Sequence, residues 1–198
     1  MDIPQKKLFV KQKVETLEIL TGFETKNKYR VMDDQQKDFL YAYEESNFLA
    51  RQFLSRYRPL KIIIIDNNKA PQLTIERPFF WLRSSHTVKT ADGQVLGYIR
   101  QKDWFLKLSF DVFDSSDKLL FNASSRKFRY WTYHVIKDGQ EVGLVAKKWS
   151  GILKEGFTDA DNFLIDFGTI TDNKEKQLLL AAAFAIEVRA FESSSRRR

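Results

Sequence analysis

The sequence of 198 residues lacks most of the residues and motifs that covalent chemistry requires. Without cysteine it has no disulfide, thiolate metal site, cysteine nucleophile or palmitoylation site. Its only two histidines, His86 and His134, lie far apart in strand-like surroundings, where a single histidine is more often structural than a ligand. No glycine-rich phosphate loop, nucleophile elbow or HExxH pattern occurs. We therefore expect a protein that is not a covalent catalyst.

An apolar run of bilayer length is also missing. The one long helix signal is Lys174–Phe191, with Asp172 as the expected N-cap, and it is apolar on every face, including Leu178, Leu179, Phe184 and Ile186. A membrane span needs ~20 mostly apolar residues, and extending this run takes in charges that cost roughly 2.5–3.5 kcal/mol each at the bilayer centre. The pattern favours a helix buried in a protein core over a membrane span.

The charge balance indicates an anionic partner. Lysine and arginine number 33 against 26 acidic residues, a net charge of +7. A negatively charged membrane leaflet fits this balance, nucleic acid is the less favoured partner, and the charge also serves solubility alone. The first residues, MDIPQKKLFVKQK, carry charges where a signal peptide would be apolar. We expect a cytoplasmic protein that associates peripherally with the inner face of a membrane.

Short strands dominate the rest of the chain. Two Asp-Gly pairs, at 92–93 and 138–139, are hairpin signals, because glycine tolerates the positive φ that such turns need. The segments GQVLGYI, from Gly93, and GQEVGLV, from Gly139, repeat one another. The expected strands are 8–13, at an edge, and 28–32, 39–43, 61–65, 72–76, 95–101, 105–113, 118–122, 128–137 and 141–147.

Two related runs of antiparallel strands followed by one apolar helix predict a mainly β fold. Closing the strands into a barrel around the helix would remove exposed sheet edges and bury the helix. We expect a short polar lead over residues 1–7, one domain over 8–192 and a basic tail over 193–198.

Residues 149–163, WSGILKEGFTDADNF, resemble a signature of the phospholipid scramblases, members of the tubby-like (LURP-one-related) superfamily. The segments 17–29, 65–78 and 191–193 support the resemblance in the same order along the chain. It implies a twelve-stranded β-barrel around a hydrophobic C-terminal helix, and calcium-activated, ATP-independent, bidirectional movement of phospholipids between leaflets. The family's cysteine-rich, palmitoylated stretch is replaced here by Arg51–Pro59, which has no cysteine, so membrane binding must rely on charge or apolar side chains.

The resemblance also implies a calcium site, which maps to residues 159–170. Asp159 and Asp161 suit the first two ligand positions of a calcium loop, and Asp166 adds a ligand only in a geometry unlike an EF-hand. Ile170 stands where the terminal acid belongs. The alternative, which the sequence favours, is a turn whose aspartates bond to the backbone. We expect any Ca²⁺ to bind weakly, in the millimolar range.

Two clusters combine positive charge with aromatic rings that suit the headgroup level of a membrane: Lys147–Lys148–Trp149, and Arg77 with Phe79, Phe80 and Trp81. The alternative is that the rings pack in the core and the lysines are solvated. The leading hypothesis is a phospholipid scramblase-like protein. The alternative is a tubby-like module that binds anionic phospholipids or nucleic acid and transports nothing.

Overall fold

The structure is a computed structural model that describes residues 1–12, 27–45, 57–103, 108–126, 129–147 and 162–191, with only the backbone of 103, 129, 130, 190 and 191. Within these ranges lie twelve strands and one helix. They are β1 (Lys7–Gln12), β2 (Lys28–Met32), β3 (Asp38–Glu45), β4 (Leu60–Asp66), β5 (Pro71–Arg77), β6 (Ser85–Thr90), β7 (Val95–Asp103), β8 (Ser109–Asp114), β9 (Leu119–Arg126), β10 (Arg129–Lys137), β11 (Gln140–Ala146), β12 (Asn162–Asp166) and α3 (Asn173–Phe191).

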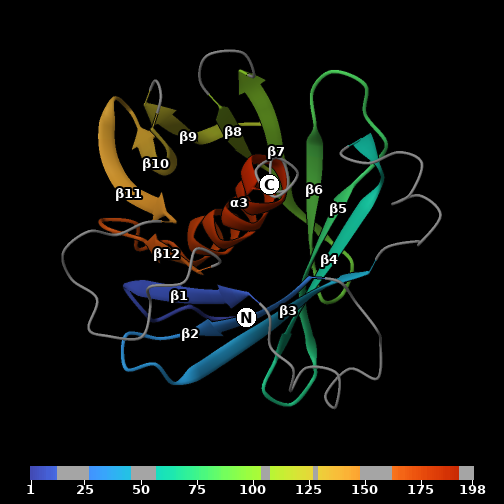
Figure 1. Cartoon of the computed structure of the whole chain (residues 1–198), viewed down its shortest axis with the longest axis vertical. Coiled ribbons are helices and arrows are strands. Elements are labelled where there is room, and N and C mark those ends of the chain that lie inside the picture. The colour runs from blue at the N-terminus through green and yellow to red at the C-terminus, as the bar shows by residue number, and fades with distance from the viewer. Residues whose placement is uncertain (13–26, 46–56, 104–107, 127–128, 148–161, 192–198) are drawn as a thin grey trace, which may run out of the picture.

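The strands form a closed antiparallel barrel around α3, so the predicted fold class is confirmed (Figure 1). Each strand pairs with its neighbours in sequence, and β1 pairs with β12 to close the ring. The expectation of an edge strand near residue 8 was wrong, because β1 has hydrogen-bonded partners on both sides. Strand β6 was not predicted, since its first inward residue, His86, is polar and interrupts the apolar alternation.

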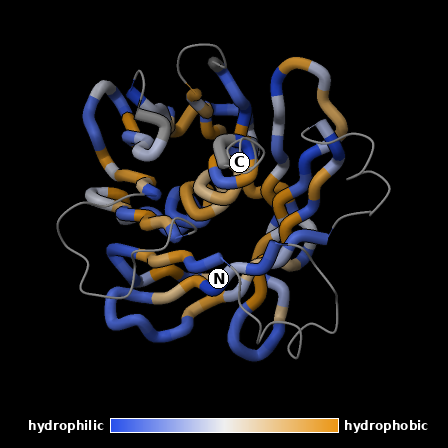
Figure 2. Tube along the Cα trace, viewed as in Figure 1, coloured by the Kyte–Doolittle hydropathy of each residue, from blue (hydrophilic) through white to orange (hydrophobic). Residues whose placement is uncertain are grey.

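Inward residues of the strands and the whole apolar run of α3 share one core. Figure 2 shows the helix, with its hydrophobic residues coloured orange, inside the ring of strands. Leu178, Leu179, Phe184 and Ile186 are each at most 1% exposed. The helix begins where it was expected, because the Asp172 carboxylate accepts a hydrogen bond of 2.9 Å from the Glu175 amide. The apolar residues of α3 therefore face protein on every side.

The repeated sequence segments bring two glycines against the start of the helix. A Cβ atom added to Gly97 would lie 2.2 Å from the Phe113 carbonyl oxygen and 2.9 Å from Cδ2 of Leu178. A Cβ atom added to Gly143 would lie 2.8 Å from a strand carbonyl oxygen, next to Leu179. Glycine at 97 therefore lets the barrel wall approach both the neighbouring strand and α3 closely, whereas glycine at 143 is required by the neighbouring strand.

Short hairpins build one end of the barrel, which we call the turn end. Asp33, Asp66 and Asp114 each begin a five-residue turn and accept hydrogen bonds of 2.8–3.0 Å from amides two and four residues later. The fourth position of these turns has positive φ, at Gln36, Lys69 and Asp117, and at Gly93 in the turn between β6 and β7.

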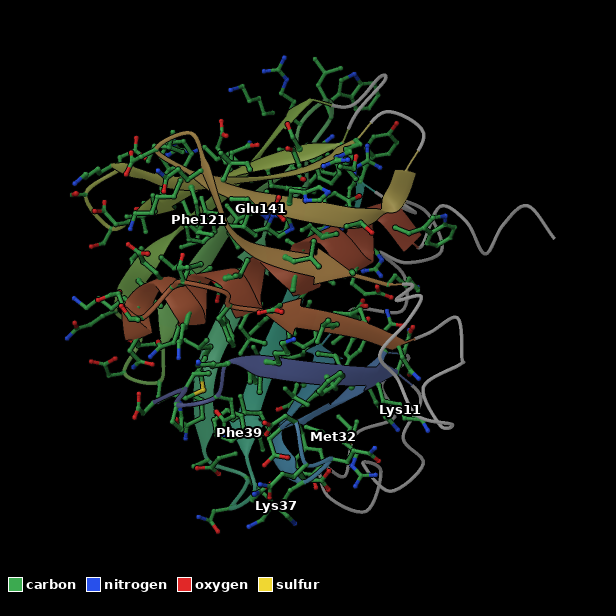
Figure 3. The ribbon with its side chains drawn as sticks, turned by 90° about the vertical axis from the view of Figure 1, so that its left-hand side faces the viewer. Lys11, Met32, Lys37, Phe39, Phe121 and Glu141 are labelled. Carbon is green, nitrogen blue, oxygen red and sulfur yellow. The ribbon has the colours of Figure 1, made fainter. Side chains whose placement is uncertain are left out.

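We call the other end, where β1, β3, β5, β7, β9 and β11 finish and α3 leaves the barrel, the exit end. Figure 3 shows the barrel from the side, with Lys11 of β1 near this end. The even-numbered strands begin at this end, because every pair of neighbouring strands is antiparallel. At the turn end, by contrast, residues Met1 to Gln5 lie against the first turn of α3, where Lys176 Nζ donates to the carbonyls of Ile3 and Gln5 at 2.8 and 3.1 Å.

Candidate lipid-contact site

The segment Pro78–Ser84, which connects β5 to β6 at the exit end, exposes a run of apolar side chains. Phe79, Trp81 and Leu82 are 46%, 76% and 63% exposed, and Arg83 beside them is exposed too. Phe80 is turned the other way and is buried. We call this segment the strap. Exposed apolar side chains gathered in this way are typical of a contact surface.

Phe80 fixes the strap to the barrel. Its ring lies under two guanidinium groups, with Cζ of Arg77 at 5.0 Å and Cζ of Arg189, in the last turn of α3, at 5.9 Å from the ring centroid. Tyr57 packs edge-on against Phe80 at 5.6 Å and stacks with Trp81 at 6.2 Å. The exposed rings therefore project from an anchored segment.

Gln101 of β7 holds the far end of the strap. Its side-chain oxygen accepts a hydrogen bond from the Ser84 hydroxyl at 3.2 Å and another from Nε of Arg189 at 3.2 Å. Its backbone amide donates to the Ser84 carbonyl at 2.9 Å. Strap, strand and helix end are thus joined at one residue.

A layer of buried and half-buried polar side chains underlies the exit end. Its members continue the inward alternation of the strands or come from the end of α3, and we call them the polar layer: Glu44, Arg58, Arg77, His86, Gln101, Lys147, Glu187 and Arg189. The Arg58 guanidinium lies 2.6 Å from the Glu44 carboxylate, which also accepts from Asn27 at 2.6 Å. Cations outnumber carboxylates four to two in this layer, so it gives the exit end a positive field.

The polar layer was not predicted from the sequence, although the sequence contains a pattern that indicates it. Leu73, Ile75 and Arg77 occupy every second position of β5, so all three point inward. Glu44 likewise continues the row of inward residues on β3. A charged residue that ends an inward apolar row predicts a buried charge near a barrel end. We instead assigned Arg77 to the surface because of the aromatic residues that follow it.

His86 is completely buried, and neither ring nitrogen forms a hydrogen bond of normal geometry with the described residues. Burial, together with the nearby positive charge of Arg77, lowers the pKa of His86 to about 3, and a weaker interaction with the Ile99 backbone opposes this shift. The imidazole is therefore neutral at physiological pH. This geometry suits a structural residue and not a proton carrier.

The structure separates the residues predicted to contact lipid. Trp81 is exposed, whereas Arg77 is 2% exposed and donates a hydrogen bond to the Arg58 carbonyl at 3.0 Å. The Lys147 side chain is 7% exposed and lies 3.3 Å from the Glu187 carboxylate. Arg77 and Lys147 thus lie beneath the surface where direct lipid contact was predicted. Lys148 and Trp149 lie outside the described residues.

The predicted calcium site is only partly described. Asp166 lies 3.1 Å from the Lys7 ammonium through one carboxylate oxygen and accepts from the Gly168 amide at 2.9 Å through the other. Both carboxylate oxygens of Asp166 thus already have a partner within the protein. Asp159 and Asp161 fall outside the described residues. In the part of the chain that the structure describes, no three acidic or histidine side chains are grouped to hold a metal ion.

Among the described residues, no helix combines the length and the apolar composition that crossing a membrane requires. The structure thus defines a closed antiparallel barrel that encloses its C-terminal helix and presents an aromatic strap over a positively charged layer at one end.

The comparisons with known proteins agree with this class. Residues 3–193 match the Scramblase family, and the chain belongs to the phospholipid scramblase family. It is 32% identical to human Phospholipid scramblase 1 over 94% of this chain and 63% of the relative. It is 31% identical to mouse Phospholipid scramblase 1 over 93% of this chain and 61% of the relative, and 30% identical to bovine Phospholipid scramblase 2 over 93% and 68%.

The chain spans about three-fifths of the length of the scramblase 1 proteins that it matches. No solved structure matches it at a significant level.

Proposed function

We propose that this protein binds anionic phospholipid membranes through the strap and moves phospholipids between leaflets in both directions without ATP. The observation that carries the proposal is the exposure of Phe79, Trp81 and Leu82 beside Arg83, on a segment anchored from beneath by Phe80. Family membership supplies the lipid chemistry, because the relatives are named phospholipid scramblases. No covalent catalysis is required of the chain.

The strap suits the interface of a bilayer for two physical reasons. Aromatic rings such as Trp81 are favoured at headgroup level, and a basic neighbour such as Arg83 is attracted to anionic lipids. The anchoring of Phe80 by Arg77 and Arg189 means that little conformational entropy is lost when the exposed rings insert.

The route for translocation cannot use the apolar side chains of α3 in the state described, because Leu178, Leu179, Phe184 and Ile186 are inside the barrel. A headgroup must cross a hydrocarbon layer ~30 Å thick in which unpaired polar groups are costly. We propose that the docked protein thins the bilayer locally or assembles in several copies to provide a path.

The burial of α3 also favours a second candidate function. In it the protein is a tubby-like module that binds anionic phospholipids or, less favoured, nucleic acid, and transports nothing. Liposomes loaded with a fluorescent phospholipid and treated with dithionite distinguish the two functions. A translocating protein increases the dithionite-accessible fraction beyond the outer leaflet, whereas a binding module leaves it unchanged while still sedimenting with the vesicles.

Membrane binding itself is tested by Trp81→Ala in sedimentation with vesicles that contain phosphatidylserine. Removing one inserted ring should weaken binding by about tenfold, equivalent to ~1.4 kcal/mol. The matched control is Leu119→Ala, which removes a side chain that is 52% exposed at the turn end and should leave binding unchanged. Equal losses in the two variants, or no loss in either, would count against the strap.

Calcium dependence belongs to the same proposal. We expect calorimetry to give a millimolar constant for Ca²⁺, a value within the range of low-affinity modules. The readouts are the heat of binding and the rate of lipid movement with and without Ca²⁺. A low-micromolar constant that is lost in Asp159→Ala would contradict this expectation, while Asp166→Asn should leave the constant unchanged.

A further inference from the structure

In the part of the chain that the structure describes, exposed aromatic side chains occur at two separate places on the exit end. One is the strap, between β5 and β6, and the other is Trp131 near the start of β10, which is 42% exposed. Strands β7, β8 and β9 lie between these places in the ring. The exposed apolar residues of the turn end, Val95 and Leu119, are aliphatic. Among the described residues, exposed large aromatic side chains are therefore confined to one end of the barrel.

The two ends of the barrel also differ in their charged residues. The connections of the turn end, residues 33–37, 66–70, 90–94, 114–118, 137–140 and 166–173, contain nine aspartates and four lysines. The exit end has the cation-rich polar layer within it and exposed Arg83, Lys102 and Arg126 around it. The turn-end connections therefore carry an excess of carboxylates, whereas cations are in excess in the polar layer and among these exposed residues of the exit end.

We infer that the barrel docks end-on on an anionic phospholipid bilayer, with the exit end in the headgroup region and the barrel axis along the membrane normal. This inference rests on the proposed membrane binding and adds its orientation. Contact through the flank that carries β4 to β6 would present the strap to the bilayer but leave Trp131 on another side of the barrel. An end-on approach brings both aromatic places to the same plane.

The length of the barrel makes this orientation electrostatically favourable. Seven-residue strands such as β4 give a height of roughly 20 Å at ~3.3 Å per residue, which exceeds the Debye length of ~8 Å at physiological ionic strength. In the end-on orientation the aspartates of the turn end are therefore screened from the anionic headgroups. Lying on its side, the barrel would hold several of them close to the membrane.

The partner that fits the exit end is a broad anionic surface. The two aromatic places lie a third of the ring apart, and basic side chains are distributed between them at Lys102 and Arg126. A bilayer meets all of them at once, and its interface accepts aromatic rings at any position in the plane.

The absence of cysteine allows a direct test in the whole chain, because single cysteines can be introduced without removing any. Two variants place the label at the exit end: Leu82→Cys in the strap and Arg126→Cys at the end of β9. Thr74→Cys places it on the outer face of β5. Two further variants place it at the turn end: Ala91→Cys and Ser115→Cys. Each variant is labelled with an environment-sensitive fluorophore and mixed with phosphatidylserine-containing vesicles that carry a doxyl quencher at shallow depth.

We expect a blue shift and quenching at positions 82 and 126, and neither at 74, 91 or 115. Responses at 82 and 74 without one at 126 would show docking through the side of the barrel and overturn the inference. Responses at the turn end would overturn it as well. Sedimentation of the labelled variants with the vesicles is measured in parallel, so a failure of membrane binding itself is recognised separately. Circular dichroism confirms that each variant is folded.

Discussion

The hairpin turns of the turn end and the polar layer of the exit end satisfy their polar groups by different means. At the turn end, aspartates such as Asp66 bond to backbone amides two and four residues away, so each turn is complete within five residues. At the exit end, buried charged side chains bond to partners far along the chain, such as Glu44 to Arg58 and Arg189 to Gln101. A substitution in one hairpin turn therefore affects that turn alone, whereas a substitution in the buried network affects the other members of the network as well.

The largest expected effect is at the exit end, in Glu44→Ala. Removing this carboxylate leaves the buried Arg58 charge uncompensated, which should lower the free energy of unfolding by about 3–5 kcal/mol. The neighbouring Glu45→Ala is the control. Glu45 is about half exposed and pairs with Lys61, so its loss should cost less than about 1 kcal/mol. Urea denaturation of both variants measures the difference, and equal costs would remove the contrast between buried and exposed pairs.

The second effect is a pH dependence at the exit end that His86→Leu removes. The pKa of His86 is about 3 in the folded protein, below its value of ~6.5 in an unfolded chain, so below pH 6.5 the unfolded state binds the proton first. Stability is therefore lost as the pH falls from 6.5 towards 3. At pH 4.5 the loss relative to pH 7 should be about 3 kcal/mol larger in the wild type than in His86→Leu.

Denaturant titrations of both proteins at pH 7, 5.5 and 4.5 give this comparison. If the stability of the two proteins changed with pH in the same way, His86 would bind its proton as readily in the folded barrel as in the unfolded chain. That result would contradict the prediction.

A smaller effect is expected at the turn end from Asp172→Ala. This change removes the side-chain cap of α3 and should cost about 1 kcal/mol of unfolding free energy. Asp172→Asn keeps an oxygen acceptor and should be close to neutral. Thermal denaturation of the two variants tests this, and a cost above that of Glu44→Ala would reverse the ranking of the two ends.

The smallest effect is a gain in stability at the same end. Lys69 is exposed and has a positive φ of 66°, so Lys69→Gly should raise the free energy of unfolding by about 0.5–1 kcal/mol. The reciprocal change, Gly93→Ala, should lower it by about 1 kcal/mol, since a Cβ there meets nothing within 4 Å and only the backbone conformation is strained. Chemical denaturation measures both, and a loss in Lys69→Gly would contradict the role given to φ.

Local patterns predicted the barrel and its helix from the sequence. The alternation of apolar and polar residues predicted most of the strands. The last helix is apolar on all faces and has charged ends, which favoured a position inside the protein core. The exit end was not predicted, because its pairs join residues as far apart as Gln101 and Arg189, and a sequence window contains no such pair. Aromatic neighbours of Arg77 indicated a surface cluster, whereas its position in the alternation of β5 turns it inward.

The contact between the first residues and the last helix has a consequence for synthesis. Lys176 bonds to the Ile3 carbonyl across 173 positions of sequence, and β1 completes its pairing only with β12. The barrel therefore cannot close until nearly all of the chain has left the ribosome. Because such long-range contacts slow folding, strand edges remain unpaired while the chain emerges. Strand β1 thus lacks one of its two partners until β12 has been synthesised, and we expect production of the protein to depend on chaperones that cover unpaired strands.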